Sequence, residues 1–190
     1  MDLEEAIRTR RSIGKVKADP VPRELVERII EAAVWAPNHH HTEPWKFVVL
    51  TGEGRRRLGR AYAEIAEETM AGVADEEKQQ RLAKEEAKAM RSPVVIAAVC
   101  SPSTSPKALR TEELAAVHAA VQNLLLSAHA SGLGAIWRSG DAAYHPAMKR
   151  ALGLEEHEEV AGLIYVGYPD VVPPDGRRTP GTQKTAWIDN

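Results

Sequence analysis

The sequence of 190 residues is poor in the residue types that stabilise small secreted or zinc-binding domains. It has one cysteine, Cys100, so no internal disulfide can form, and no Cys-x-x-Cys pair exists for thiol redox chemistry or zinc. Aromatic residues make up only 5% of the chain and hydrophobic residues 43%, so aliphatic side chains and alanine must fill most of the core. These features predict a globular chain in a reducing compartment, and we expect a cytoplasmic location.

Neither an excess of charge of one sign nor a long apolar run is present. The 25 basic and 27 acidic residues leave a formal net charge of -2, without the basic footprint of a nucleic-acid-binding protein. The most apolar stretch, residues 114–133, contains two histidines and two amides, which indicates a buried helix and not a membrane span. The first ten residues carry acids where a secretory signal would carry bases. We therefore expect neither nucleic acid nor a membrane as a partner.

Motifs of hydrolases and nucleoside triphosphatases are also absent from the sequence. There is no Gly-x-Ser-x-Gly elbow, no His-Glu-x-x-His helix and no Walker loop. The glycines within residues 51–55 follow a predicted strand but lack the third glycine of a dinucleotide fingerprint, so a tight turn explains them. The sequence therefore contains no motif that would indicate a hydrolase, a nucleoside triphosphatase or a Rossmann-type dinucleotide-binding domain.

The apolar periodicity predicts an α+β fold in a single domain spanning residues 1–190. Strands are predicted at residues 45–50, 93–99, 133–137 and 160–166. Helices are predicted from residue 3 to about Gly14, over 22–36, as two solvent-facing helices between 53 and 90 that could form a lid, over 111–131, and around 143–152. Residues 170–190 contain three prolines and no periodicity, so we expect an extended C-terminal arm that packs on a partner subunit.

The first candidate site is the triplet Arg10-Arg11-Ser12, with Lys15 close behind. Guanidinium groups offer forked donors to phosphate and a serine hydroxyl adds another, so the triplet suits a phosphate monoester. Three consecutive helical residues do not share a face, and a helix C-terminus repels anions, so convergence requires the helix to end here. An exposed surface pair of arginines is the alternative interpretation.

The second candidate is the loop from Pro37 to Trp45, which contains three consecutive histidines between two prolines. If the loop were extended, His39 and His41 would point one way and His40 the other, which disfavours a metal site built from this run. We expect no metal here. The loop forms either the wall of a polar pocket or a simple exposed segment.

The third candidate, residues 132–140, places a helix stop, a short strand and then polar residues in sequence. The ends of strands commonly carry ligands, which favours a binding role for the residues after the strand. The alternative is that Trp137 belongs to the core and Arg138 forms a structural ion pair.

Four motifs together resemble the nitroreductase family, and the short length and histidine-containing loop are similar to its smaller bacterial branch. They are Arg10-Arg11-Ser12 near the start, Glu43-Pro44-Trp45 before the first strand, Gly132-Leu-Gly-Ala-Ile-Trp-Arg138, and Gly167-Tyr168-Pro169. Each motif alone is weak, but their order and spacing match over nearly the whole chain. The resemblance implies an α+β flavoprotein with a mostly antiparallel central sheet flanked by helices, in an interlocked homodimer.

The resemblance also implies a set of FMN-binding residues, because each flavin of the family touches both subunits. The central helix at about residues 111–131 would pack across the interface. The matching residues are Arg10, Arg11 and Ser12, with Arg178 as a later basic contact to phosphate; Pro37, Asn38, His39 and His41 from the other subunit; and Trp137, Arg138, Ser139 and Gly140 along the isoalloxazine ring.

The activity implied by the resemblance is an NAD(P)H-dependent FMN oxidoreductase. NADH or NADPH would reduce the flavin at N5, and a nitroaromatic, quinone or similar acceptor would then take its place in a ping-pong mechanism. No side chain is named as a general acid or base. Trp35 and His41 are the candidate acceptor-pocket residues.

Two residues depart from the family pattern. Glu43 stands where Gln is usual before Pro-Trp, and Trp35 stands where the smaller branch often has Arg. These departures leave two alternatives open: a flavin-binding protein without turnover, and a different reaction on the same fold, such as dehalogenation or flavin fragmentation.

Overall fold

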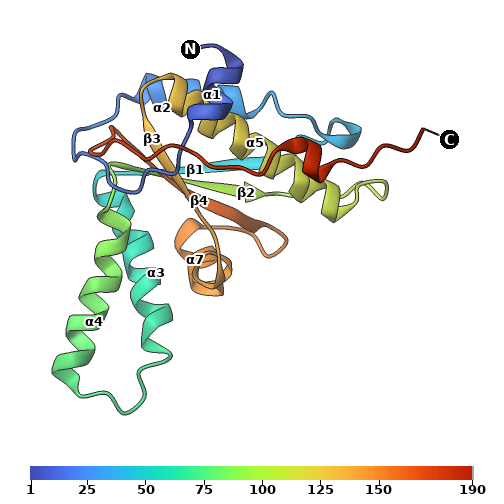
Figure 1. The fold of residues 1–190 in the computed structure, drawn as a ribbon. Helices are drawn as coiled ribbons and strands as arrows, with labels where there is room; N and C mark the ends of the chain where they lie inside the picture. Colours follow the sequence, from blue (N-terminus) through green and yellow to red (C-terminus); the bar gives the residue numbers. More distant parts are fainter. Residues whose placement is uncertain (190) are drawn as a thin grey trace.

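Four antiparallel strands form the centre of the protein in the computed structural model, which describes residues 1–189. They lie in the order β1-β2-β4-β3 (Figure 1). Their bounds are β1 (Trp45–Thr51), β2 (Val94–Cys100), β3 (Gly134–Arg138) and β4 (Glu159–Gly167). The predicted strands are confirmed to within one residue at each end. β2 and β4 occupy the centre and are the longest uninterrupted apolar runs, as expected for strands covered on both faces.

Helices cover both faces of the sheet. On one face, α2 (Arg23–Ala33) and α5 (Arg110–Ala130) pack against the sheet, with Ile29, Leu124 and Ile164 fully buried between them. On the other face lie α3 (Arg56–Glu67), α6 (Asp141–Tyr144) and α7 (Pro146–Leu152), with Leu58 and Met148 fully buried. Burying a side chain of this size contributes roughly 1.5–3 kcal/mol. The α+β prediction with a flanked antiparallel sheet is confirmed.

The helix predicted around residues 143–152 is in fact two helices. Pro146 occupies the first turn of α7, where its ring is tolerated, but it cannot continue α6 across that point. His145 lies between the two helices and caps α7, because its Nδ1 accepts a hydrogen bond of 3.2 Å from the Ala147 N–H. The proline causes this break between the two helices, and the spacing of apolar residues alone does not reveal it.

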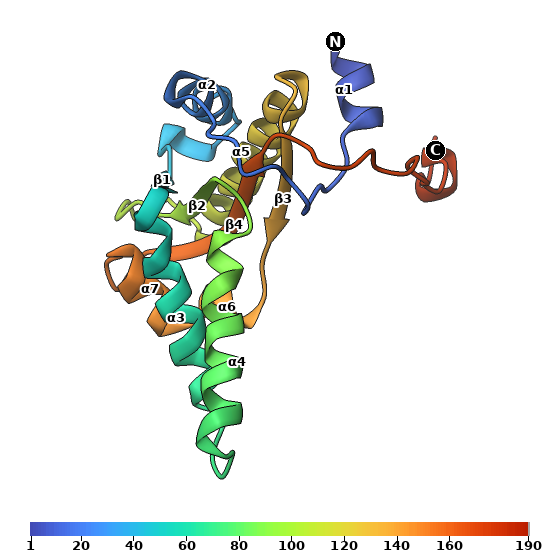
Figure 2. The same ribbon diagram turned by 90° about the vertical axis from the view of Figure 1, so that its left-hand side faces the viewer.

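The helices α3 and α4 (Asp75–Ala87) form a hairpin that projects away from the sheet (Figures 1 and 2). No residue of α4 is buried, which confirms the predicted solvent-facing helix there. The same prediction was wrong for α3, which buries Leu58, Ala61 and Tyr62 against the sheet. A Cβ at Gly59 of α3 would lie 2.8 Å from the Glu86 carbonyl oxygen of α4, so glycine permits the close approach of the two helices. The turn η2 (Gly52–Arg55) leads from β1 into α3. It is the tight turn that explains the glycines of residues 51–55 without a nucleotide-binding loop.

Residues 170–189 leave the body of the molecule as an arm on the side of α1 (Leu3–Thr9), as Figure 2 shows. Apart from the short turn η4 (Gly181–Lys184), the arm has no regular structure. Three apolar side chains on it are among the most exposed of the chain: Val172 at 95%, Trp187 at 83% and Ile188 at 89%. Among residues 1–189, no helix is long and apolar enough to cross a membrane.

Candidate functional site

The segment Arg10–Ile13 follows α1 as extended chain and runs along the edge of β3. The prediction that this helix ends near Gly14 was wrong, because α1 ends at Thr9 and Arg10 already has extended torsions. The cause is a contact with a distant part of the chain. The Ile13 N–H donates a hydrogen bond of 3.0 Å to the Ala135 carbonyl, and Ser12 forms a parallel β-bridge with Ala135. Pairing with β3 therefore draws the arginine triplet out of the helix.

Three arginines gather beside this segment: Arg10, Arg11 and Arg178. Burial lowers the pKa of Arg10, and the charges of Arg11 and Arg178 lower it further. No carboxylate pairs with any of the three among residues 1–189. Three like charges without a counter-charge are costly unless an anion is bound between them. The three guanidinium groups offer the charge and the donors that an anion would need.

Arg11 has a structural role as well. Its Nη1 donates to the carbonyls of Arg8 at 2.7 Å and Arg10 at 2.8 Å, which satisfies acceptors at the end of α1. Its Nε is buried and has no partner within the described chain. Lys15, in contrast, pairs with Asp170 at 3.2 Å and does not join the three arginines.

The residues after β3 lie at the far end of the same edge. Ser139 and Gly140 are exposed, and Gly140 has a φ of 106°, which favours glycine. Trp137 is half-buried and its Nε1 donates to the Ala161 carbonyl at 3.3 Å, so this ring belongs partly to the core. Ser12 pairs with Ala135, and Ser139 is four residues further along, about 13 Å at 3.3 Å per residue. The arginines and the exposed strand end thus mark the two ends of one elongated surface.

A cavity of about 340 Å³ opens beside Ser139 on the face of the sheet that carries α3. Arg138 and Arg91 bring positive charge to its wall, and Tyr62 and Tyr165 also line it, whereas the charge of Lys88 is paired with Glu85. We refer to it as the Arg138 cavity. The alternative of a structural ion pair for Arg138 is wrong: its guanidinium lies 5.4 Å from the ring centroid of Tyr165, and its buried Nε has no partner in the described chain.

Two buried tyrosines form the floor of the Arg138 cavity. Their hydroxyl oxygens are 3.1 Å apart, and burial raises the pKa of both phenols. Sequence reasoning did not single out Tyr62, Tyr165, Lys88 or Arg91, which line this cavity. The only signal was a pair of cations just before the second strand, which by itself does not differ from a solvated helix end.

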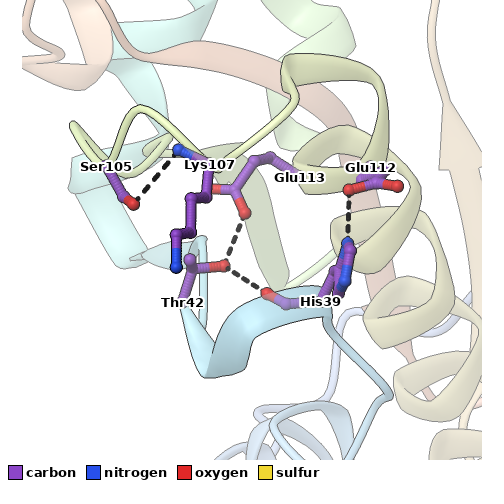
Figure 3. Close-up of polar contacts among 6 residues, drawn as sticks. All are labelled: His39, Thr42, Ser105, Lys107, Glu112 and Glu113. Carbon is purple, nitrogen blue, oxygen red and sulfur yellow. Dashed lines mark hydrogen bonds and ion pairs between the residues drawn. The ribbon is translucent and has the colours of Figure 1, made fainter.

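The loop Pro37–Thr42 lies against the start of α5, where His39 and Thr42 face Glu112 and Glu113 (Figure 3). His39 Nδ1 lies 2.6 Å from Glu112 Oε2, while Thr9 Oγ1 lies 2.8 Å from His129 Nε2 at the other end of the helix. Glu112 and His129 are 129 − 112 = 17 positions apart, about 26 Å at 1.5 Å per residue. Within one chain, the loop and the arginine triplet therefore do not meet.

The loop is not extended but turns tightly as η1 (His39–His41). His40 and His41 have φ values of 56° and 52°, so the alternating directions expected of an extended run do not apply. Residues 1–189 contain no group of three or more His, Cys, Asp or Glu side chains that could hold a metal ion. Trp35, at the end of α2, is 80% exposed, and its Nε1 donates to Glu31 at 3.2 Å.

Residues 7–168 match the model of the family described as "Nitroreductase family". YfhC of Bacillus subtilis (strain 168), which bears the name of an NAD(P)H nitroreductase, is 34% identical over 179 residues, covering 94% of this chain and 90% of its own. YdjA of Escherichia coli (strain K12), similarly named, is 31% identical over 172 residues, covering 90% of each.

Solved structures agree with the family match. A nitroreductase-like protein from Bacillus cereus superposes with a TM-score of 0.85 at 30% identity, over 100% of this chain and 97% of that one. A protein from Desulfovibrio desulfuricans, solved in complex with FMN, has a TM-score of 0.75 at 26% identity, over 100% and 98%. The likeness extends through the arginine segment, the sheet and the C-terminal arm.

Proposed function

The chain belongs to the nitroreductase family, and from this we propose that it is an FMN-dependent oxidoreductase that uses NADH or NADPH to reduce a nitroaromatic, quinone or similar acceptor. One observation carries the proposal: three arginines that pair with no carboxylate among residues 1–189 lie at one end of the β3 edge, and an exposed strand end lies at the other. FMN is itself elongated, with a dianionic phosphate at one end and an uncharged ring at the other. The relatives' names and the FMN-bound neighbour support the same choice.

The residues at the arginine end fit the phosphate. Arg10, Arg11 and Arg178 would supply the charge, and the Nε of Arg11, which has no partner among residues 1–189, is a donor that an oxyanion would satisfy. Ser12 would add its hydroxyl, since its backbone is already paired with β3. The objection that a helix C-terminus repels anions loses force, because the triplet lies beyond the end of α1 in extended chain.

The residues at the other end fit the ring. Trp137, Arg138, Ser139 and Gly140 would line it, with the positive Arg138 cavity alongside. When bound, FMN supplies the redox chemistry, accepting a hydride from NAD(P)H and delivering it to the acceptor. The side chains bind, orient and charge-balance the cofactor, and we assign none of them as a general acid or base. Reductant and acceptor would use one face in turn, which makes the mechanism ping-pong.

We propose that the working unit is a homodimer. Pro37, Asn38, His39 and His41 lie at one end of α5 and the arginines at the other, so one chain cannot bring both to one flavin. Two copies related by a two-fold axis across α5 would place the loop of one on the arginines of the other. Trp35, next to this loop, and His41 would then border the acceptor pocket. The exposed arm would pack on the second subunit, and the single cysteine fits a cytoplasmic setting.

The proposal is tested by purifying the protein and titrating it anaerobically with NADH and with NADPH. We expect a yellow protein whose flavin absorbance is bleached by at least one of the two and restored by a quinone or nitroaromatic. A colourless protein that takes up no added FMN would overturn the proposal. Flavin that is bound but not reduced would indicate a flavin-binding protein without turnover.

A further inference from the structure

The turn that carries His39 is held in an unfavourable backbone conformation. Three residues that are not glycine have left-handed torsions: His40 at 56°, His41 at 52° and Glu43 at 47° in φ. Each such residue costs on the order of 1–3 kcal/mol, so contacts elsewhere must hold the turn in place. Asn38 provides one of them, because its Oδ1 accepts a hydrogen bond of 3.0 Å from the Glu43 N–H. Strain of this kind is typical of segments that position a functional group.

Two adjacent carboxylates in the first turn of α5 supply the other contacts (Figure 3). Glu113 is only 2% exposed, and its two oxygens accept hydrogen bonds from the Thr42 hydroxyl and from the Ser103 N–H, the latter at 2.8 Å. It therefore ties the histidine turn to the loop that precedes α5. Both donors satisfy the buried charge, which makes Glu113 a structural anchor.

Glu112 makes a different kind of contact, directed at one ring nitrogen. Its Oε2 lies 2.6 Å from Nδ1 of His39, and the two side chains are 40% and 56% exposed. A carboxylate only accepts, so Nδ1 carries the hydrogen. The ring of His40 stacks on that of His39 with centroids 3.7 Å apart, which restricts its rotation. Nε2 has no hydrogen-bond partner within residues 1–189 and is the nitrogen left for a ligand.

We propose that Glu112 is a positioning residue that acts through His39, fixing the tautomer and direction of the ring so that Nε2 meets the FMN bound on the other subunit. The inference rests on the proposed function. A histidine held by a carboxylate through one nitrogen presents the other in a defined state, an arrangement that proteins use to orient histidine ligands. The neighbouring Glu113 fixes the position of the histidine turn through its hydrogen bonds, and Glu112 fixes the orientation of the His39 ring.

The test compares Glu112→Ala, Glu112→Gln and the control Glu27→Ala, which removes a surface ion pair with Arg23 on α2. FMN affinity is measured by fluorescence titration, and the tautomer of His39 by ¹⁵N NMR, with its ring signals assigned by their loss in His39→Asn. We expect Glu112→Ala to weaken FMN binding about 10-fold and to shift the ring toward a mixture of tautomers. Glu112→Gln, whose amide oxygen still accepts from Nδ1–H, and Glu27→Ala should stay near wild type.

The outcomes separate this inference from the function on which it rests. Wild-type affinity and an unchanged tautomer in Glu112→Ala would overturn the role of Glu112 while leaving the oxidoreductase proposal intact. Equal loss of affinity in Glu112→Gln and Glu112→Ala, with no change of tautomer in either, would show that Glu112 does not act through His39. A wild-type protein that binds no FMN would overturn both proposals.

Discussion

Thr9 Oγ1 lies 2.8 Å from His129 Nε2, joining the end of α1 to the last turn of α5 directly beside the arginine cluster. The Thr9 hydroxyl donates its hydrogen to the Glu5 carbonyl at 2.6 Å, so Nε2 of His129 must be the donor. Burial lowers the pKa of His129, and the charges of Arg10 and Arg11 lower it further. The imidazole therefore reports on the charge in the proposed phosphate site.

The first prediction concerns this histidine. FMN phosphate would offset the charges of Arg10 and Arg11, so binding should raise the pKa of His129. The complex then binds more protons than the free protein, and by linkage FMN affinity should increase as the pH falls through the titration of His129. NMR titration of the ring with and without FMN measures the first effect. Affinity measured between pH 5 and 7 in the wild type and in His129→Gln measures the second, because the FMN phosphate titrates in both proteins and only the difference between them reports on His129.

The same lowered pKa has a consequence for stability without ligand. A histidine whose pKa is lower in the folded state than in the unfolded state favours folding in its neutral form. Its contribution is present above the unfolded value of about 6.5 and is lost as the pH falls toward the folded value. Denaturant unfolding of the FMN-free protein should show this loss, and His129→Gln should reduce it. An identical pH dependence in both proteins would contradict the assignment.

The second prediction is that Arg10→Ala weakens FMN binding without destabilising the free protein. Arg10 is repelled by Arg11 and Arg178, so its removal should leave the free protein as stable as before or slightly more stable. A charge-assisted hydrogen bond to phosphate contributes roughly 1.5–3 kcal/mol, so FMN affinity should fall about 10- to 100-fold. Thermal unfolding with and without FMN measures both. Arg28→Ala, an exposed residue of α2, controls for the loss of one charge.

The strands and the long central helix could be predicted because they depend on local patterns. Residues 94–100 and 159–167 are short, nearly continuous apolar runs rich in valine and isoleucine, and this length and composition favour buried strands. The end of α1 could not be predicted, since it is set by pairing between Ile13 and Ala135, far apart in the sequence. No residue near Thr9 indicates that the helix ends there because the following segment pairs with β3.

The candidate site divides in the same way. The arginine triplet and the segment 137–140 could be found because each is a compact motif. The Arg138 cavity could not, because Tyr62, Lys88, Arg91 and Tyr165 are scattered residues that only the α3–α4 hairpin and β4 bring together. The left-handed turn at His40 and His41 was also invisible, since histidine adopts positive φ too rarely to signal it. Long-range packing decided each of these features.

The third prediction tests how Trp137 is held. A Cβ at Gly162 would lie 1.9 Å from Nε1 and 2.4 Å from Cδ1 of Trp137, so Gly162→Ala must displace the indole or the strand. Overpacking of this kind costs typically about 1–3 kcal/mol, and here it should also weaken FMN binding, since Trp137 begins the ring-lining segment. Gly54→Ala, where an added Cβ meets nothing within 4 Å, is the matched control. If Trp137 transmits the effect, Gly162→Ala combined with Trp137→Leu should be less destabilised than the sum of the single variants.

The fourth prediction concerns the C-terminal arm and the dimer. Trp187 and Ile188 are 83% and 89% exposed in the single chain, and large apolar side chains so exposed mark an interaction surface when they lie together. If the second subunit covers them, the variant Trp187→Ala with Ile188→Ala should dissociate at protein concentrations where the wild type stays dimeric, as measured by sedimentation. Since Arg178 is retained, any loss of FMN should follow the loss of the dimer and be reversed by raising the protein concentration. Gln183→Ala, on the same arm, should behave as wild type. A double variant with unchanged dimer affinity would show that the arm does not hold the subunits together, and the loop of residues 37–41 would then have to reach the second flavin through contacts along α5 alone.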